Sequence, residues 1–455
     1  GKLPSAWKIS HVVPVHKKGS KLDANNYRPI SLTSVPCKIM ESLIRDKVVE
    51  HLMSHDLFSD SQHGFVPGRS CVTQLLHTLE EWTTWLDQGE KVDVVYLDFQ
   101  KAFDSVPHQR LLSKLDAYKI QGNFKTWIAD FLHGRTQRVV VNNARSQWCN
   151  VKSGVPQGSV LGPTLFVLYI NDLPEVLDST VRIYADDTKA FSCVSTPDQR
   201  KLLQADLCSL TDWSSKWQLQ FNARKCCVLH LGSGDCQERY TIGSSALSTV
   251  GETKDLGVLV DDKLKFHSHV SYAINKANRV LISIRRAFQC HDTSTIPKLF
   301  KGLVRPLLYG NVIWSPRYIS DAKAVERVQK RATKMISTMK HLPYIERLKC
   351  LNLPSLEYRR RRGDMIQVYK IIYEHDRLNP DHFFQLADTP TRGHSLKLSK
   401  PRCRTNVRKN TFSHRVIDDW NSLPEVVVQA PTIDAFKTRL DRCWKEQCHI
   451  SQYSN

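Results

Sequence analysis

The sequence has no run of about 18 consecutive apolar residues, so it predicts no membrane-spanning helix. It begins with GKLPSAWK, without an initial methionine and without the apolar core of a secretory signal peptide. Its 13 cysteines are scattered and form no C-x-x-C pair, which is typical of reduced thiols. These absences predict an intracellular chain of the nucleus or cytoplasm, neither secreted nor membrane-bound, that is part of something longer.

Acidic residues are in the minority. The sequence has 45 Asp and Glu against 65 Lys and Arg, which gives a formal net charge of +20. That excess is larger than solubility requires and points first to a polyanionic partner, nucleic acid before membrane. Internal repeats, low-complexity tracts and long linkers are also absent. With 455 residues, 41% of them hydrophobic, the chain is long enough for several domains or one multi-lobed enzyme.

Strand and helix patterns alternate along the first half of the chain, which indicates the α+β class with an antiparallel sheet. A buried strand over 91–99 is followed by a helix over 102–118, for which Asp104 or Ser105 is the expected cap. Further strands are predicted over 136–143 and 146–155, paired through a turn at Asn142-Asn143, and over 181–194, with a buried helix over 158–173.

The pattern changes after about residue 260, where apolar residues recur at helical spacing between basic ones. Helices are predicted over 264–288, 321–339 and 355–375. The last of these carries YRRRRGD, whose arginines 359–362 are expected either to grip RNA or to form a solvated basic face. The final third of the chain is therefore predicted to be helical and basic.

Asp186 and Asp187 lie side by side in an otherwise apolar, strand-like run, VRIYADDTKAFSC (181–193). Adjacent carboxylates repel each other and lose hydration among apolar neighbours, unless divalent cations neutralise them. Asp98, at the end of another buried strand, is the natural third ligand because neighbouring strands can bring it to the same place. Two metal ions held in this way would clamp the attacking and leaving oxygens of a phosphoryl transfer.

Several motifs around these aspartates also occur in one order. YADD (184–187), VVYLDFQKAFDSVPH (94–108) and SGVPQGSVLGPTLFVLYINDLP (153–174) resemble the palm motifs of reverse transcriptases, and more closely those of animal non-LTR (LINE-type) retrotransposons. The matches that continue this resemblance are VVPVHKKGSKLDANNYRPISLTSVPCKIMESLI (12–44), SQHGFVPGRS (61–70), FNARKC (221–226) and TKDLGVLVD (253–261).

The resemblance covers about residues 5–265 and implies a right-hand polymerase. The tail over 408–444 resembles the C-terminal segment of the jockey and chicken-repeat groups of these elements. The implied domains are fingers at 1–90, incomplete at the N-terminus; a palm at 91–262 with the catalytic motifs and inserted finger elements (reverse transcriptase domain about 5–262); a helical thumb at 263–340 that tracks duplex phosphates; and a basic C-terminal region of unknown role at 341–455.

By resemblance, Asp98, Asp186 and Asp187 would hold two Mg²⁺ ions together with the backbone carbonyl of Phe99, and Mn²⁺ is expected to substitute. One ion would activate the primer 3′-hydroxyl, and the other would bind the triphosphate and the leaving pyrophosphate. Asp187 is expected to contribute less directly than the other two aspartates. Lys225 is expected to protonate or neutralise the pyrophosphate.

Phe103 carries the prediction about the sugar, because a ring beneath the sugar would clash with a ribose 2′-hydroxyl and so favour dNTPs. Its alternative role is that of an ordinary core residue. The other residues implied at the substrates are Lys17 or Lys18 with Arg28 at the triphosphate, Gln157 and Gly158 at the nascent base pair, and Leu256 and Gly257 at the primer end.

The resemblance implies an RNA-directed DNA polymerase that extends a DNA primer with dNTPs on an RNA template, without a membrane partner. The alternative is a fragment of a decayed element that binds RNA without polymerising. Phe103 and Ala185 in YADD disfavour an RNA-dependent RNA polymerase, and the tail disfavours a telomerase-like enzyme or an intron maturase. No acidic constellation after residue 340 indicates an RNase H domain, and nothing before residue 5 is expected to encode an endonuclease.

Overall fold

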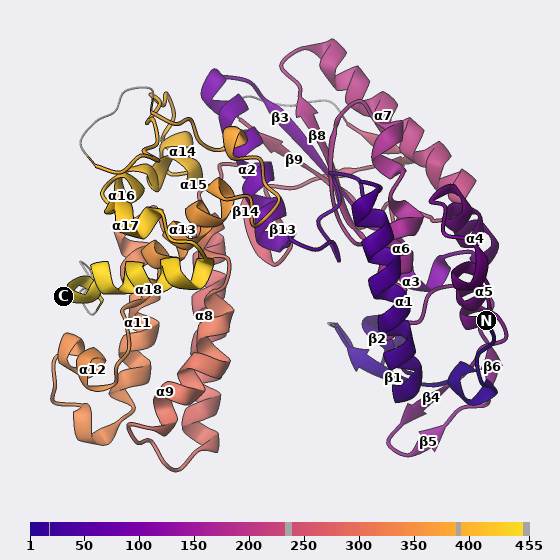
Figure 1. Cartoon of the computed structure of the whole chain (residues 1–455), viewed down its shortest axis with the longest axis horizontal. Helices are drawn as coiled ribbons and strands as arrows, with labels where there is room; N and C mark the ends of the chain where they lie inside the picture. Colours follow the sequence, from indigo (N-terminus) through magenta and orange to yellow (C-terminus); the bar gives the residue numbers. More distant parts are fainter. Residues whose placement is uncertain (18, 233–238, 388–392, 449–455) are drawn as a thin grey trace. The chain divides into compact units, whose positions relative to one another are not determined.

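The computed structural model describes residues 1–17, 19–232, 239–387 and 393–448. The chain divides into two compact units (Figure 1). Among the described residues, no helix combines the length and the apolar character that crossing a membrane requires. Unit 1 comprises residues 1–70, 93–228 and 235–249, and unit 2 comprises residues 71–92, 229–234 and 250–455.

Helices and strands are mixed throughout the chain, which confirms the predicted α+β class. The strands are β1 (Ile9–His16), β2 (Tyr27–Leu32), β3 (Val92–Leu97), β4 (Thr136–Val141), β5 (Ala144–Arg145), β6 (Cys149–Asn150), β7 (Thr180–Tyr184), β8 (Asp187–Cys193), β9 (Cys227–Leu231), β10 (Thr241–Ile242), β11 (Ser245–Ala246), β12 (Ser248–Thr249), β13 (Glu252–Asp255) and β14 (Val258–Asp261). The helices of unit 1 are α1 (Val35–Ser54), α3 (Ala102–Ser105), α4 (His108–Ala117), α5 (Gly122–Leu132), α6 (Gly162–Ile170) and α7 (Pro197–Trp217).

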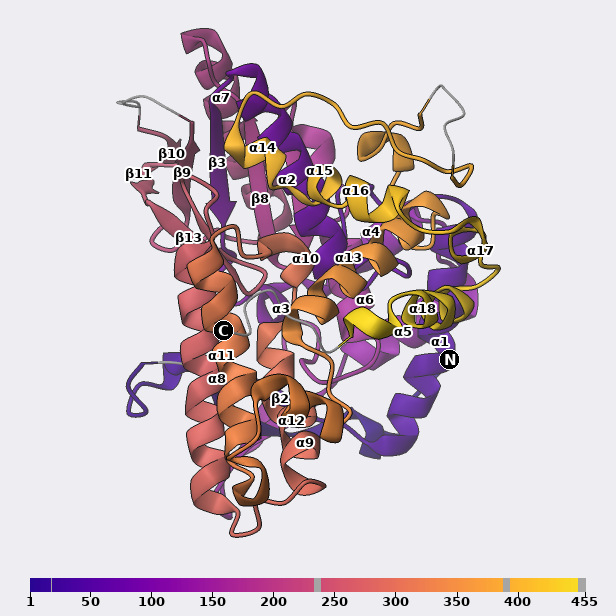
Figure 2. The ribbon, with the colours of Figure 1, turned by 90° about the vertical axis from the view of Figure 1, so that its left-hand side faces the viewer.

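Unit 2 is mostly helical in its described part, as the basic, periodic final third predicted. The long helices α8 and α11 lie side by side (Figures 1 and 2). Its helices are α2 (Cys71–Gln88), α8 (His267–Ala287), α9 (Thr295–Leu299), α10 (Asn311–Trp314), α11 (Ile319–Lys334), α12 (Tyr344–Cys350), α13 (Leu356–Ile372), α14 (Asn406–Lys409), α15 (Phe412–Arg415), α16 (Ile417–Asn421), α17 (Glu425–Val428) and α18 (Ile433–Cys443).

Two five-stranded sheets contain most of the strands. One sheet has the order β2-β1-β4-β5, with β6 paired to β4, and the other has the order β12-β9-β3-β8-β7. Strand β3 has five buried residues out of six, as its near-continuous apolar sequence predicts. Asp98 follows the last residue of β3, and Asp187 is the first residue of β8. These two strands are neighbours in the sheet.

The hairpin between β4 and β5 turns at Asn142 and Asn143, as predicted, and both residues have positive φ (46° and 69°). Asparagine tolerates this left-handed conformation better than most residues do. Helix α6 is also confirmed as a buried helix, since every residue in it except Pro163 is buried. It begins four residues later than expected, because Gly158 adopts a φ of 107° that ends any helical run there.

The single helix expected over 102–118 is wrong. Helices α3 and α4 are separate, because Pro107 disfavours the helical region for Val106, which lies at φ −61° and ψ 115°. The residue before α4 is Pro107, so neither Asp104 nor Ser105 caps that helix.

Two arginines of the basic run 359–362 pair with acidic residues of the C-terminal helices. Arg361 Nη2 lies 2.7 Å from Asp419 Oδ1, and Arg362 Nη2 lies 2.8 Å from Asp441 Oδ2. A purely solvated basic face is therefore wrong for Arg361 and Arg362, while the expected contact with RNA stays a prediction. These two arginines hold α16 and α18 against α13 through charge-assisted hydrogen bonds.

Glu41 of α1 is fully buried and joins two segments that are distant in the sequence. Its Oε2 accepts hydrogen bonds from the backbone N–H groups of Val160 (2.7 Å) and Leu161 (3.0 Å), directly before α6. A carboxylate at this position satisfies donors at the helix start that have no partner within the helix.

Replacing Glu41 with alanine should destabilise the fold by about 3 kcal/mol, because two buried N–H groups lose a charged acceptor. Urea unfolding of the two proteins measures this difference. Glu50→Ala is the matched control, since Glu50 lies on the same helix, is exposed and forms a surface ion pair with Lys47. Equal destabilisation by the two substitutions would contradict the role assigned to Glu41.

Candidate active site

Asp98 lies directly after β3 and is held by neighbouring backbone. Its carbonyl accepts a hydrogen bond from Asn222 N at 2.7 Å, and the next residue, Phe99, forms a β-bridge with Phe221 and stacks on its ring at 4.6 Å. The Asp98 carboxylate is 40% exposed, and Lys225 Nζ lies 3.0 Å from its Oδ1. The carboxylate thus lies at the surface while its backbone is fixed by the core.

Asp186 and Asp187 lie at the tip of the β7–β8 hairpin, as predicted. Tyr184 pairs with Asp187, which leaves Ala185 and Asp186 as a two-residue turn. Ala185 has a φ of 54°, a left-handed conformation that costs a non-glycine residue about 1 kcal/mol. Both aspartates are exposed at this tip.

The turn is supported from beneath by the segment 61–64, which the sequence did not single out for this task. Gln62 is fully buried, and its Oε1 accepts hydrogen bonds from Ala185 N (3.1 Å) and Gly64 N (2.7 Å). Backbone bonds of 2.8 Å join His63 N to Ile183 O and Ile183 N to Ser61 O. The SQHGF motif was the available signal, but only the strand pairing shows what it holds.

Gly64 is required by close approach to the same turn. A Cβ atom on this residue would lie 2.5 Å from Ala185 N and 3.0 Å from the carbonyl carbon of Tyr184. Both neighbours are backbone atoms that cannot rotate away. A side chain at residue 64 would therefore displace the aspartate turn.

Acidic and basic side chains lie close enough to Asp186 to shift its pKa. Partial desolvation by the surrounding protein raises the pKa of Asp186, and the negative charge of Asp98 raises it further. The positive charges of Arg28 and Lys17 act in the opposite direction. Desolvation lowers the pKa of Lys17, helped by Arg28 and Lys225. These five residues therefore interact electrostatically with one another, and their roles at the substrates stay predictions.

The donors at this site fit a hard divalent cation. Asp98 and Asp186 offer only oxygen atoms, which Mg²⁺ prefers, and their mutual repulsion is the electrostatic condition that a cation relieves. In this structure Lys225 neutralises Asp98 in part. The residues present are therefore suited to Mg²⁺, with Asp187 at the same tip.

Phe103 contributes to the core through one face. Its ring stacks on Phe166, with centroids 4.5 Å apart, and the residue remains partly exposed. Its carbonyl accepts a hydrogen bond from Val155 N at 2.7 Å. Both the core role and a role at the sugar therefore remain compatible with its surroundings.

Gln157 and Gly158 are held by other parts of unit 1. Gln157 Nε2 donates to Asp104 Oδ1 at 3.1 Å, and burial raises the pKa of Asp104. A Cβ on Gly158 would lie 2.7 Å from the backbone oxygen of Ser31 in β2, so the glycine permits close packing there. Lys18, the alternative to Lys17, lies outside the described residues.

Leu256 and Gly257 form the turn between β13 and β14 in unit 2, with φ of 44° and 93°. The hydroxyl of Tyr309 donates to the carbonyl of Leu256. A Cβ on Gly257 would lie 2.9 Å from the hydroxyl oxygen of Tyr309. The glycine is thus required by the turn and by Tyr309. Its role at a primer remains a prediction.

The chain matches the family described as "Reverse transcriptase (RNA-dependent DNA polymerase)" over residues 15–267, more than half of its length. The chain belongs to the reverse transcriptase family. Asp98 and the YADD turn both lie inside the matched range. A right-hand polymerase fold followed by a helical region agrees with this membership.

Curated relatives of the chain include mobile elements of flies. The chain is 27% identical over 352 residues to the probable RNA-directed DNA polymerase from transposon BS of Drosophila melanogaster (74% of this chain, 39% of the relative). It is 28% identical over 405 residues to the RNA-directed DNA polymerase from mobile element jockey of Drosophila funebris (83% and 42%). The predicted resemblance to the jockey group is confirmed, and the chain spans about two fifths of these relatives' length.

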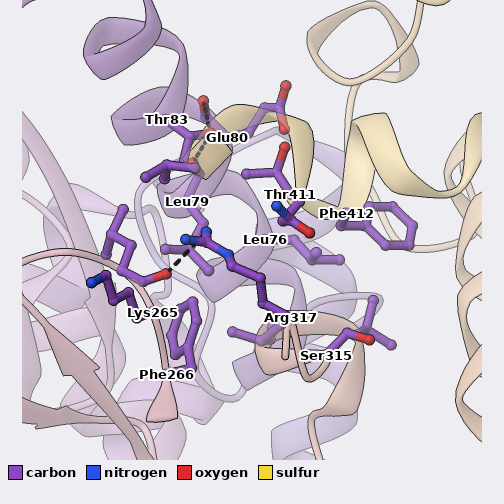
Figure 3. Close-up of a pocket in the computed structure, with 15 residues that line it drawn as sticks. Leu76, Leu79, Glu80, Thr83, Lys265, Phe266, Ser315, Arg317, Thr411 and Phe412 are labelled. Carbon is purple, nitrogen blue, oxygen red and sulfur yellow. Dashed lines mark hydrogen bonds between the residues drawn. The ribbon is translucent and has the colours of Figure 1, made fainter. Parts of the chain in front are cut away.

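A separate pocket of this reverse-transcriptase-family chain lies within unit 2 (Figure 3). Leu76, Leu79 and Phe412 line it, and Arg317 points into it and donates to the carbonyl of Leu264 at 3.5 Å. None of the predicted catalytic residues lines this pocket. It is distinct from the open, charged surface on which the aspartates lie.

Gly64→Ala should lower any metal-dependent activity on the order of 100-fold, because displacing the aspartate turn by a fraction of an ångström misplaces its carboxylates. The steric clash should also lower the free energy of unfolding by about 1–3 kcal/mol. Gly251→Ala is the control, since a Cβ there meets nothing within 4 Å. Unchanged kinetics in Gly64→Ala would contradict the close approach.

Asp186→Asn should stabilise the metal-free protein near pH 7. The pKa of Asp186 in the folded state is raised above its unfolded value of 3.8. The folded state therefore loses stability relative to the unfolded state as pH rises from the unfolded pKa through the folded one. Asparagine does not ionise, so the variant avoids this loss of stability. The advantage should shrink towards about pH 4, where the unfolded carboxyl is itself half protonated. Thermal unfolding in EDTA at both pH values tests this, and a less stable Asn variant near pH 7 would contradict it.

Proposed function

We propose that this chain is an RNA-directed DNA polymerase that extends a primer 3′-hydroxyl with dNTPs on an RNA template. The observation that carries the proposal is the convergence of Asp98 and Asp186 with Lys17, Arg28 and Lys225 in one cluster. Family membership supplies the reaction class, and the names of the fly relatives agree with it. Residues 1–90, 91–262 and 263–340 are proposed as fingers, palm and thumb.

In the proposed reaction, Asp98, Asp186 and Asp187, with the carbonyl of Phe99, hold the metal ions. Bound Mg²⁺ would supply Lewis-acid activation of the primer hydroxyl and neutralise the pyrophosphate charge, and Mn²⁺ would substitute. The turn and the end of β3 present carboxylates on fixed backbone, so this backbone need not move when the substrates bind.

The cationic residues are assigned to the triphosphate. Lys17 and Arg28 are both exposed, and each interacts electrostatically with Asp186, which places positive charge beside the metal ligands. We assign them to the incoming phosphates, where guanidinium and ammonium groups stabilise developing charge. Lys225, at 3.0 Å from Asp98, would leave that carboxylate when metal binds and then neutralise or protonate the pyrophosphate.

The sugar is assigned to Phe103. Its stacking on Phe166 fixes the ring, and a fixed ring excludes a 2′-hydroxyl better than a mobile one. Gln157 and Gly158 are assigned to the nascent base pair, and the turn at Leu256 and Gly257 to the primer end.

The four exposed basic residues of α8 are assigned to duplex phosphates. They lie on the solvent side of a helix whose other face is buried through Ala273, Ala277 and Leu281. Phosphate contacts of this kind add affinity without reading sequence, so any template could be held in the same way. The four residues are Lys276, Arg279, Arg285 and Arg286.

Primer extension on an RNA template with Mg²⁺ tests the proposed function. Wild type should incorporate dNTPs, and Asp186→Asn should lose roughly 1,000-fold or more of the rate, because one metal ligand becomes a neutral amide. Asp198→Asn is the matched control, since Asp198 is 87% exposed and forms a surface ion pair with Lys201.

Phe103→Ala in the same assay should raise rNTP use relative to dNTP use by roughly tenfold or more, while the thermal transition shows that the protein remains folded. Unchanged sugar selectivity in folded Phe103→Ala would leave only the core role for this ring. A folded wild type that binds RNA but incorporates no nucleotide would overturn the polymerase proposal in favour of an RNA-binding fragment.

A further inference from the structure

Two histidines and a glutamate converge in unit 2, apart from the residues assigned to polymerisation. His77 and Glu81 lie one turn apart on α2, and His382 ends the short 3₁₀ segment Pro380–His382. His77 Nε2 lies 3.7 Å from Glu81 Oε1, and His382 Nε2 lies 3.8 Å from the same oxygen. One atom from each of the three residues lies within 4.8 Å of the other two.

The position of His382 is set by the packing around it. Asn379 caps the 3₁₀ segment by accepting a hydrogen bond from Asp381 N at 3.0 Å, and the next residues, Phe383 and Phe384, are buried. Further along, Ala387 N bonds to Lys397 O at 2.9 Å, so this part of the segment is held against the chain at its far end too. The histidine is therefore delivered to α2 by an ordered segment.

The two imidazole rings meet edge to face, with centroids 4.7 Å apart and planes at 87°. His77 and Glu81 are both half-buried, whereas His382 is exposed and has room to adjust. Zn–N bonds of about 2.0–2.1 Å in tetrahedral geometry require donor atoms roughly 3.3 Å apart. The two distances to Glu81 exceed that separation by only about half an ångström.

We propose that His77, Glu81 and His382 form a zinc site. Two imidazoles and one carboxylate are a ligand set that suits Zn²⁺, whereas Mg²⁺ prefers oxygen ligands alone. The site is thus chemically distinct from the aspartate cluster and does not depend on the proposed polymerase function. Three protein ligands leave a fourth position for water.

The role of this site is to fasten the C-terminal region to α2. The same helix already holds that region through Glu80, whose oxygens accept from Arg408 Nη2 at 2.5 Å and Ser413 Oγ at 2.6 Å. At the end of α2, Asp87 accepts from Thr405 N at 2.7 Å. Zinc would add a further attachment beside Glu80, through His77 and Glu81 of the same turn, and stabilise the region by linkage.

Titration of the reduced full chain with Co²⁺ tests the site, because Co²⁺ replaces Zn²⁺ and its spectrum reports the ligand type. One equivalent should bind without a thiolate-to-cobalt charge-transfer band and should be displaced by Zn²⁺ but not by Mg²⁺. Glu81→Gln and His382→Ala should each weaken binding by roughly tenfold or more. His341→Ala, which removes an exposed histidine elsewhere in unit 2, should bind as wild type does.

Zn²⁺ should also slow amide hydrogen exchange across residues 379–387 in wild type and in His341→Ala, but not in the two ligand variants. The near-isosteric Glu81→Gln keeps the test valid if His382→Ala is poorly folded. Absence of saturable Co²⁺ binding, a thiolate band, or equal affinity in the folded ligand variants would overturn the site. Binding without slower exchange would overturn its fastening role.

Discussion

The amide side chain of Gln62 connects the aspartate turn to the body of unit 1. Its oxygen is buried and bonds to the backbone of Ala185 and of Gly64, so a polar group in the core fixes a strained, exposed tip. Without such support, the repulsion between neighbouring carboxylates and the left-handed backbone of Ala185 would both favour fraying of the hairpin. The geometry of the site therefore depends on a hydrogen bond made outside the charged cluster.

The positive charge of the chain has two different uses. In unit 2, Arg361, Arg362 and Arg408 each pair with an acidic residue, so some of the basic side chains hold the C-terminal region together. On α8, by contrast, basic residues line the exposed side of an amphipathic helix. Such pairs already cancel within the formal net charge of +20, so this excess remains available to a polyanionic partner.

Helix α2 holds the C-terminal region of unit 2 through polar side chains. Its leucines 75, 76 and 79 are buried with Trp82, and its acidic residues Glu80 and Asp87 receive hydrogen bonds from the segment that contains α14 and α15. Glu81, one residue further round the helix, faces two histidines. The C-terminal region is thus tied to α2 by polar contacts, which explains why its role could not be deduced from an amphipathic pattern alone.

Most of the secondary structure and the identity of the acidic cluster were determined by the sequence alone. The buried strand before Asp98, the asparagine turn and the aspartate hairpin were predictable because each depends on residues that are neighbours in the chain. Motif order also predicted the family, which the comparisons confirmed. The break between α3 and α4 could also have been predicted, because a proline at residue 107 disfavours a helical conformation at the residue before it.

Tertiary structure decided what lies beneath and around those elements. Gln62 under the hairpin, Gly158 against Ser31, and Arg361 and Arg362 against distant aspartates all depend on contacts between residues far apart in the chain. The cluster of two histidines and Glu81 has the same origin. No local pattern encodes such contacts, because burial and side-chain direction are set only when separate segments pack together.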